Sequence, residues 1–220
     1  MDVINFIVDP NNDFIGHTIE YLQICGISIV LAITIGVVLG VAVSRSPIAA
    51  FVAVNLSGLM RAIPVIAFLI LVIPILHTGD PPTIVALVIL GIPPILLNTY
   101  TSIRGIDPAT IDAAKGIGMT TWQNITRIQT PLVLPIIAAG IRTSAVQIVA
   151  TATLAAIIGA GGYGDYIIDG VNTFRNAEIL AGAIPVAILA MMIELIMSWL
   201  QRLLTPEGLR LQEKVDIAKA

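Results

Sequence analysis

Five long apolar segments constrain this chain more than any other feature. They lie at residues 21–43, 48–76, 83–103, 132–158 and 179–203. Each has about the 20 residues that an α-helix needs to cross a bilayer. The chain is 57% hydrophobic and 11% charged, whereas a soluble domain has about 25% charged residues. Lipid must cover the surplus, so the sequence predicts an all-α polytopic membrane protein, with five transmembrane helices in a single domain of residues 1–220.

The placement of Lys and Arg predicts the orientation, because cytoplasmic loops are enriched in these residues. The stretch before the first segment has none, and neither has the loop of residues 77–82. Basic residues recur in alternate connections, at Arg45, at Arg104, Lys115 and Arg127, and at Arg202, Arg210, Lys214 and Lys219. The amino terminus is therefore expected outside the cell, and the third loop and the carboxyl terminus are expected in the cytoplasm.

Prolines and ionisable residues interrupt the spans. Proline removes a helix hydrogen bond, and such breaks are tolerated where neighbouring helices or a wet cavity satisfy the backbone. Ionisable groups in a span usually face the bundle interior. The candidate pathway or gate residues are Met60, Arg61, Pro64, Tyr100, Arg142 and Glu194. We expect Glu194 to pair with Arg142 or Arg61, either as a structural ion pair or as part of a gate.

The third loop, residues 104–131, is a polar stretch between two apolar runs. We call its part Asp107–Pro131 the polar island. Asp107 can cap a helix that begins at the following proline. Gly116 and Gly118 can adopt the left-handed conformation that ends a helix.

A second helix is predicted in the island. Thr120 and Gln123 fit a capping box, and we expect Pro131 to stop the helix. Ala113 and Ala114 keep one face of the first helix narrow, which would let another surface approach closely. The polar island is therefore interpreted as a docking surface for a soluble partner. The alternative is a pair of amphipathic helices lying on the membrane.

The polar island resembles the coupling motif of permease subunits of ATP-binding-cassette importers. That motif reads Glu-Ala-Ala, three residues, Gly, nine residues, Ile, one residue, Leu-Pro. The residues at the same spacing here are Asp112, Ala113, Ala114, Gly118, Ile128 and Pro131. Asp112 replaces the family's Glu, and Thr130 replaces its Leu. The five-span layout is similar to the type I importer permeases of the methionine-importer kind, so the resemblance covers nearly the whole chain.

Within that superfamily, residues 98–104, 140–144 and 151–162 resemble the osmoprotectant permeases. This implies a bacterial or archaeal cell-membrane permease for glycine betaine, choline or carnitine. The glycine-rich stretch after residue 158 also resembles that of amino-acid permeases, so a permease for methionine or another amino acid stays open. We interpret the same stretch as a tight turn at the outer face.

The resemblance implies three protein partners. They are a cytoplasmic ATP-binding-cassette ATPase dimer that binds ATP and Mg²⁺, an extracytoplasmic substrate-binding protein, and a second permease copy or related chain. The chain itself lacks the G-x-x-x-x-G-K-[ST] loop, has one cysteine, and has isolated histidines at positions 17 and 77. We therefore expect no enzymatic activity, cofactor or metal, and no nucleic-acid partner. The rival functions are a self-sufficient secondary transporter and a membrane scaffold.

Overall fold

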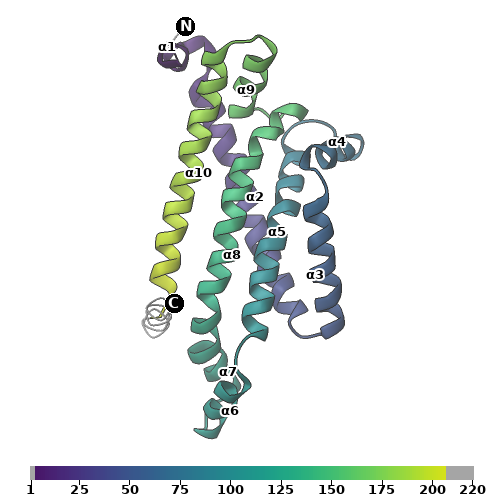
Figure 1. Ribbon diagram of the computed structural model, residues 1–220, viewed down its shortest axis with the longest axis vertical. Coiled ribbons are helices and arrows are strands. Elements are labelled where there is room, and N and C mark those ends of the chain that lie inside the picture. Colours follow the sequence, from purple (N-terminus) through teal and green to yellow (C-terminus); the bar gives the residue numbers. More distant parts are fainter. Residues whose placement is uncertain (1–2, 207–220) are drawn as a thin grey trace, which may run out of the picture.

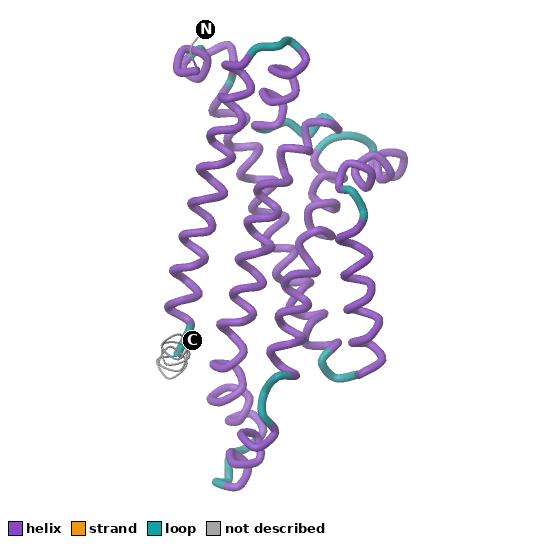
Figure 2. Tube along the Cα trace, viewed as in Figure 1, coloured by secondary structure: helices purple, strands orange, loops and turns teal. Residues whose placement is uncertain are grey.

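The computed structural model describes residues 3–206, which form helices joined by short connections with no β-strand in that range (Figure 2). The elements are α1 (Val3–Val8), a 3₁₀ turn η1 (Pro10–Asn12), α2 (Phe14–Val43), α3 (Pro47–Ala62), α4 (Val65–Leu76), α5 (Asp80–Arg104), α6 (Pro108–Gly116), α7 (Thr121–Asn124), a π-helical segment η2 (Ile125–Gln129), α8 (Thr130–Thr151), a 3₁₀ segment η3 (Ala152–Ile158), α9 (Tyr163–Asn172) and α10 (Asn176–Leu204). The fold confirms the predicted all-α membrane architecture.

The long helices run along one axis, with short elements gathered at both ends (Figure 1). We call the end that carries α6 and α7 the island end, and the end that carries α1, α4 and α9 the α9 end. Four helical stretches are long and apolar enough to cross a membrane, and α3 with α4 makes a fifth if the pair is counted as one broken span. The four are Pro10–Val43, Asp80–Arg104, Thr121–Ile158 and Asn176–Leu204.

The second predicted span, residues 48–76, is not one straight helix. The axes of α3 and α4 differ by 96°. Ile63 and Pro64 have extended backbones between them, because a residue that precedes proline is disfavoured in the helical conformation. α3 has 16 residues, which corresponds to about 24 Å of helix. It runs toward the α9 end, and α4 lies across that end (Figure 1).

Small residues let α2, α5 and α8 pack closely at the centre of the bundle. A Cβ atom added to Gly40 of α2 would lie 2.5 Å from the Thr99 Cβ of α5. One added to Gly91 of α5 would lie 2.7 Å from the Ser144 Oγ of α8, and that hydroxyl donates to the Gly91 carbonyl at 2.8 Å. Apolar surface alone does not hold helices together in lipid, so close packing and such interhelical hydrogen bonds matter here.

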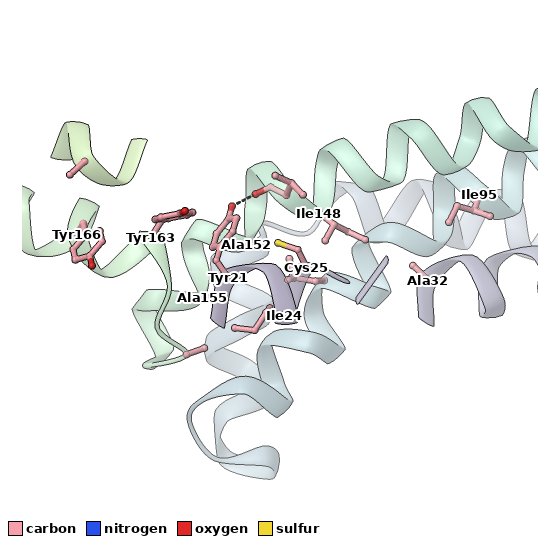
Figure 3. Close-up of a cluster of buried hydrophobic side chains, with 14 of the residues drawn as sticks. Tyr21, Ile24, Cys25, Ala32, Ile95, Ile148, Ala152, Ala155, Tyr163 and Tyr166 are labelled. Carbon is pink, nitrogen blue, oxygen red and sulfur yellow. Dashed lines mark hydrogen bonds between the residues drawn. The ribbon is translucent and has the colours of Figure 1, made fainter. Parts of the chain in front are cut away.

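Aromatic side chains close the α9 end. Tyr163 lies 5.0 Å from Tyr21 between ring centroids, and Tyr166 lies 5.3 Å from Phe6. The Tyr21 hydroxyl donates to the Val149 carbonyl (Figure 3). These rings join α1, α2 and α9 and continue into the hydrophobic cluster between the spans.

The sequence predicted only a tight turn where α9 is found. Gly159, Gly161 and Gly162 have φ angles of 73°, 71° and 78°, so the turn itself is present. Helix α9 then follows, and its packing on α2 and α10 places it at this end. α9 has ten residues, about half the length of a membrane-spanning helix, so the sequence does not mark it as a span.

The second island helix does not stop at Pro131, contrary to the prediction. α7, the π-helical segment and α8 follow one another without a break. The N–H of Thr130 donates to the carbonyl of Ile125, five residues earlier. The wider π turn just before the proline gives its ring room, so the helix continues past Pro131.

Candidate functional site

The polar island folds as a helix, a glycine turn and a second helix. The Asp107 carboxylate accepts a hydrogen bond from the N–H of Ala109 at 2.9 Å. Gly118 has a φ of 82°, the left-handed conformation expected of it. The capping box is complete, because Thr120 Oγ1 accepts from the Gln123 N–H at 3.3 Å and Gln123 Oε1 accepts from the Thr120 N–H at 2.9 Å.

Asn124 holds the two island helices together, and no sequence pattern pointed to this role. Its side chain is 3% exposed. Its Nδ2 donates to the Ile111 carbonyl at 3.3 Å, and its Oδ1 accepts from Gln129 Nε2 at 3.2 Å. The island therefore has its own buried polar joint, which lies between α6 and the π-helical segment.

The outward face of α6 carries only one of the two alanines that were expected there. Asp112 and Ala113 are exposed, but Ala114 is buried against the glycine turn, where its carbonyl accepts from the Met119 N–H at 3.1 Å. Only Ala113 of the two alanines can meet another surface. Asp112 forms an exposed ion pair with Lys115 at 3.2 Å.

Three large apolar side chains are exposed on the island, and Ile125, at 40%, is the least exposed of them. Ile117 is 77% exposed and Trp122 is 73% exposed. Exposed apolar side chains gathered in one place often mark an interaction surface. We call Asp112, Ala113, Ile117 and Trp122 the island face. Ile128 and Pro131, the last two motif positions, are half-buried where the island joins α8.

In the spans, the structure pairs Glu194 of α10 with Arg142 of α8. The side chains of Arg142 and Glu194 are 35% and 39% exposed. Gln201 Oε1 lies 3.5 Å from Arg142 Nη1. Arg61 is exposed at the end of α3 and forms no ion pair with any residue among 3–206, so it is not the partner of Glu194.

The ion pair lies in an open groove of about 470 Å³ between α8 and α10. Its lining combines polar side chains with small or branched apolar ones. The lining residues are Ala139, Arg142, Thr143, Val146, Gln147, Ala150, Glu194 and Gln201. We call this feature the α8–α10 groove.

The remaining pathway candidates lie elsewhere. Met60 lines a separate apolar cavity of about 70 Å³, together with Phe68 of α4 and residues of α5. Pro64 is exposed at the break between α3 and α4. Tyr100 is half-buried near the island end of α5. The six candidates therefore do not form one cluster.

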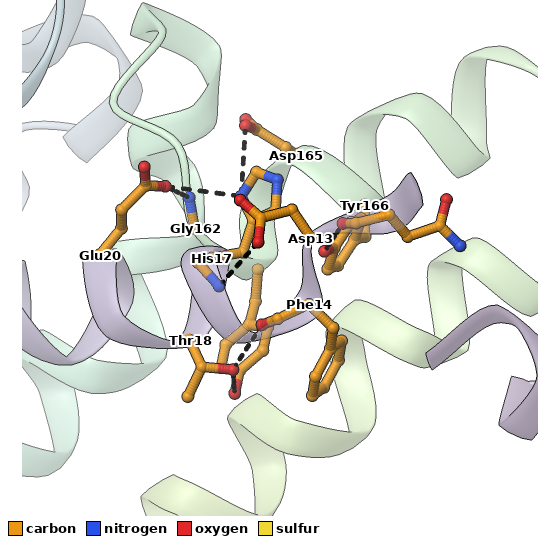
Figure 4. A network of polar contacts seen from close by, with 11 residues as sticks. Asp13, Phe14, His17, Thr18, Glu20, Gly162, Asp165 and Tyr166 are labelled. Carbon is orange, nitrogen blue, oxygen red and sulfur yellow. Dashed lines mark hydrogen bonds and ion pairs between the residues drawn. The ribbon is translucent and has the colours of Figure 1, made fainter. Parts of the chain in front are cut away.

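His17, which looked isolated in the sequence, belongs to a polar network at the α9 end (Figure 4). Its Nδ1 lies 3.5 Å from Glu20 Oε2 and 3.9 Å from Asp165 Oδ2. Glu20 also accepts from the N–H of Gly162 at 3.3 Å, which ties α2 to the glycine turn. Burial raises the pKa of the Asp165 carboxyl, and the neighbouring His17 opposes this only in part. No group of residues with metal-site geometry occurs within residues 3–206.

Several apolar spans, a charged groove between two of them and an exposed helical island together define a multi-pass membrane transport protein. The chain belongs to the family described as binding-protein-dependent transport system inner membrane component, whose profile matches residues 32–207.

Several relatives are similar to this chain over nearly its whole length. It is 40% identical to the glycine betaine/carnitine/choline transport system permease protein OpuCB of Bacillus subtilis (strain 168), over 97% of this chain and 99% of that protein. It is 39% identical to the carnitine transport permease protein OpuCB of Listeria monocytogenes, over 94% and 95%. It is 38% identical to the choline transport system permease protein OpuBB of Bacillus subtilis (strain 168), over 96% and 98%. These relatives are transport permeases rather than enzymes.

Solved structures give the same fold. An inward-facing form of the MetNI methionine ABC transporter matches with a TM-score of 0.76 and 22% identity, over 88% of this chain and 96% of that one. A crystal structure of an amino acid ABC transporter with histidines matches with a TM-score of 0.68 and 19% identity, over 92% and 97%. The fold is thus that of ABC importer permeases.

Proposed function

We propose that this chain is the transmembrane permease subunit of an ATP-driven importer for compatible solutes that are quaternary ammonium compounds, such as glycine betaine, carnitine and choline. The observation that carries the proposal is 38–40% identity, over nearly its full length, to permeases named for these solutes. A permease for methionine or another amino acid is the alternative, and its support is a likeness of fold at 22% identity.

The charges at the two ends support an orientation. The described acidic residues of the α9 end and its helix junctions are Asp9, Asp13, Glu20, Asp80, Asp165, Asp169 and Glu178, and the described Lys and Arg residues there are Arg61 and Arg175. Arg45, Arg104, Lys115, Arg127 and Arg202 lie toward the island end. By the enrichment of basic residues on the cytoplasmic side, the amino terminus lies outside and the island end lies in the cytoplasm.

In this proposal the island face docks into a cleft of a cytoplasmic ATPase. Ala113 leaves room for close approach, while Ile117 and Trp122 supply apolar anchors. ATP and Mg²⁺ bind to that ATPase and not to the permease. Two permease copies, or this chain and a related one, enclose the pathway, and a soluble receptor delivers the solute at the α9 end.

Transport then follows from two packings of the bundle that differ by a few kcal/mol. Nucleotide binding by the ATPase favours one packing through the island, which is continuous with α8 through the π-helical segment. The island is attached to the spans by the ends of α5 and α8, so a shift of the island is passed to both helices.

The test is reconstitution of the chain in proteoliposomes, with and without its ATPase, its receptor and Mg-ATP. We expect uptake of labelled glycine betaine, carnitine or choline against a gradient only when all components are present, and no uptake of methionine. Uphill accumulation by the chain alone would identify a secondary transporter. Failure of any ATPase to associate would favour the scaffold role.

A further inference from the structure

The α8–α10 groove is unusual for a surface in the spanning region. Five of its eight lining residues have polar side chains. They are Arg142, Thr143, Gln147, Glu194 and Gln201. Polar and charged groups on a span face the bundle interior or a water-filled cavity, because contact with lipid is costly. A lining of this kind indicates contact with water or with another helix rather than with lipid.

The Arg142–Glu194 pair still has free hydrogen-bonding capacity toward this groove. Both side chains are more than one-third exposed, whereas a purely structural pair in a span would be enclosed. A guanidinium has five N–H donors and a carboxylate has about four acceptor sites, so neither is saturated by the other. Thr143 and Gln147, one helical turn apart on α8, add hydroxyl and amide groups to the same wall.

We propose that the α8–α10 groove is a transit site for a zwitterionic solute, with Arg142 binding its carboxylate and Glu194 facing its ammonium group. The proposal rests on the proposed function as a solute importer. A zwitterion lying along the ion pair offers each charge an opposite charge. The groove volume, about 470 Å³, is within the range of small-molecule sites.

This assignment predicts selectivity within the permease itself. Glycine betaine and carnitine have both charges and satisfy both side chains. Choline has only the cation, so it competes for Glu194 and leaves Arg142 without an anion. The site therefore favours zwitterions over cations, in addition to any selection by the receptor.

The first test compares glycine betaine and choline uptake by the reconstituted complex. Arg142→Gln should lower the ratio of glycine betaine to choline uptake by about tenfold or more, the scale of one lost charged hydrogen bond. The matched control is Arg175→Gln, which removes the same charge from the ion pair with Glu178 outside the groove, and it should leave the ratio unchanged. An equal loss of both solutes in Arg142→Gln would mean a structural ion pair and would overturn the proposal.

The second test does not depend on which solutes the receptor binds. The Gln147→Cys variant of the complex is treated with a water-soluble thiol reagent. The native Cys25 is buried, so the reagent reports on the new cysteine. Glycine betaine should slow labelling several-fold, and choline chloride at equal concentration should slow it less. Labelling that neither solute affects, or a cysteine that no reagent reaches because a second copy covers it, overturns the transit site. ATP-dependent uptake by the unmodified complex tests the proposed function separately.

Discussion

At the α9 end, buried aromatic side chains of α1, α2 and α9 contact one another and hydrogen-bond to backbone carbonyls, whereas at the island end α6 and α7 contact chiefly each other and the adjoining π-helical segment. Tyr21 and Tyr163 are 2% and 3% exposed, but Ile117 and Trp122 of the island are 77% and 73% exposed. The first end has a buried aromatic cluster built from the chain's own residues, although Phe174, after α9, is 92% exposed. The second presents apolar surface that nothing in residues 3–206 covers.

This difference indicates where an external force can enter the bundle. An end held together by a buried aromatic cluster resists local change, because packed cores deform little. An end with its own small fold and an uncovered apolar face can bind a partner and move with it. The following predictions test this contrast, beginning with the largest expected effect.

Ala113→Arg should remove ATPase association. A charge buried without a partner in an interface costs on the order of 3 kcal/mol, which is about 100-fold in affinity. Co-purification of the ATPase with the variant measures it. Val171→Arg, an exposed position of α9 at the opposite end of the molecule, is the control and should retain the ATPase. Full retention in Ala113→Arg would remove the island face from the docking surface.

Asn124→Ala should loosen the island without altering the α9 end. It leaves the Ile111 carbonyl and the Gln129 amide without their partner, at a cost of about 1 to 3 kcal/mol. Amide hydrogen exchange in Pro108–Gly116 should become faster, and exchange in α9 should stay as it was. Equal acceleration at both ends would contradict independent folding of the island.

Tyr166→Phe should weaken the α9 end by about 1 kcal/mol, because the hydroxyl that donates to the Asn12 carbonyl is lost. The thermal midpoint of the purified protein should fall, while ATPase association should not change. Tyr100→Phe is the control, since Tyr100 makes no hydrogen bond within the described residues through its hydroxyl. Loss of the ATPase from Tyr166→Phe would show that the two ends are coupled more tightly than proposed.

Asp165→Asn should change the pH dependence of stability. Because burial raises the pKa of Asp165 above its ordinary 3.8, the folded protein holds this proton more firmly than the unfolded chain does. The resulting stabilisation is full below the ordinary value and is lost as the pH rises through the raised one. Relative to Asp165→Asn, the unmodified protein should therefore lose stability across that window.

The size of this effect should stay under about 1 kcal/mol, because the Asp165 side chain is 34% exposed and water screens it. Thermal midpoints measured across the pH window give the comparison, with Asp112→Asn on the island as the control. A gain in stability of the unmodified protein over Asp165→Asn with rising pH would reverse the sign and contradict the burial of Asp165.

Much of this fold follows from local signals in the sequence. Bilayer thickness fixes the length of an apolar helix, so the segment of residues 83–103 lies within α5 and that of residues 179–203 lies within α10. The island caps at Asp107 and Thr120 involve residues two or three positions apart, and a short spacing of this kind is visible in the sequence. Because few charged residues lie in the spans, the sequence limits the partner of Glu194 to Arg142 or Arg61.

The features that the sequence did not reveal depend on contacts between distant residues. α9 is held by Tyr163 and Tyr166, which pack on residues more than 140 positions earlier. The 96° angle between the axes of α3 and α4 depends on how α4 packs against α5. Ile117 and Trp122 were missed because exposure is a tertiary property. Their apolar character within a polar loop was the available signal.

The contrast between the two ends is tested most directly by hydrogen exchange across the reconstituted complex, measured with and without the ATPase. Protection on adding the ATPase should appear in Pro108–Gly116 and around Trp122, while α9 and the adjoining start of α2 should exchange as before. Protection that appears at α9 while the island stays unchanged would contradict the account, because the partner would then dock at the opposite end of the molecule.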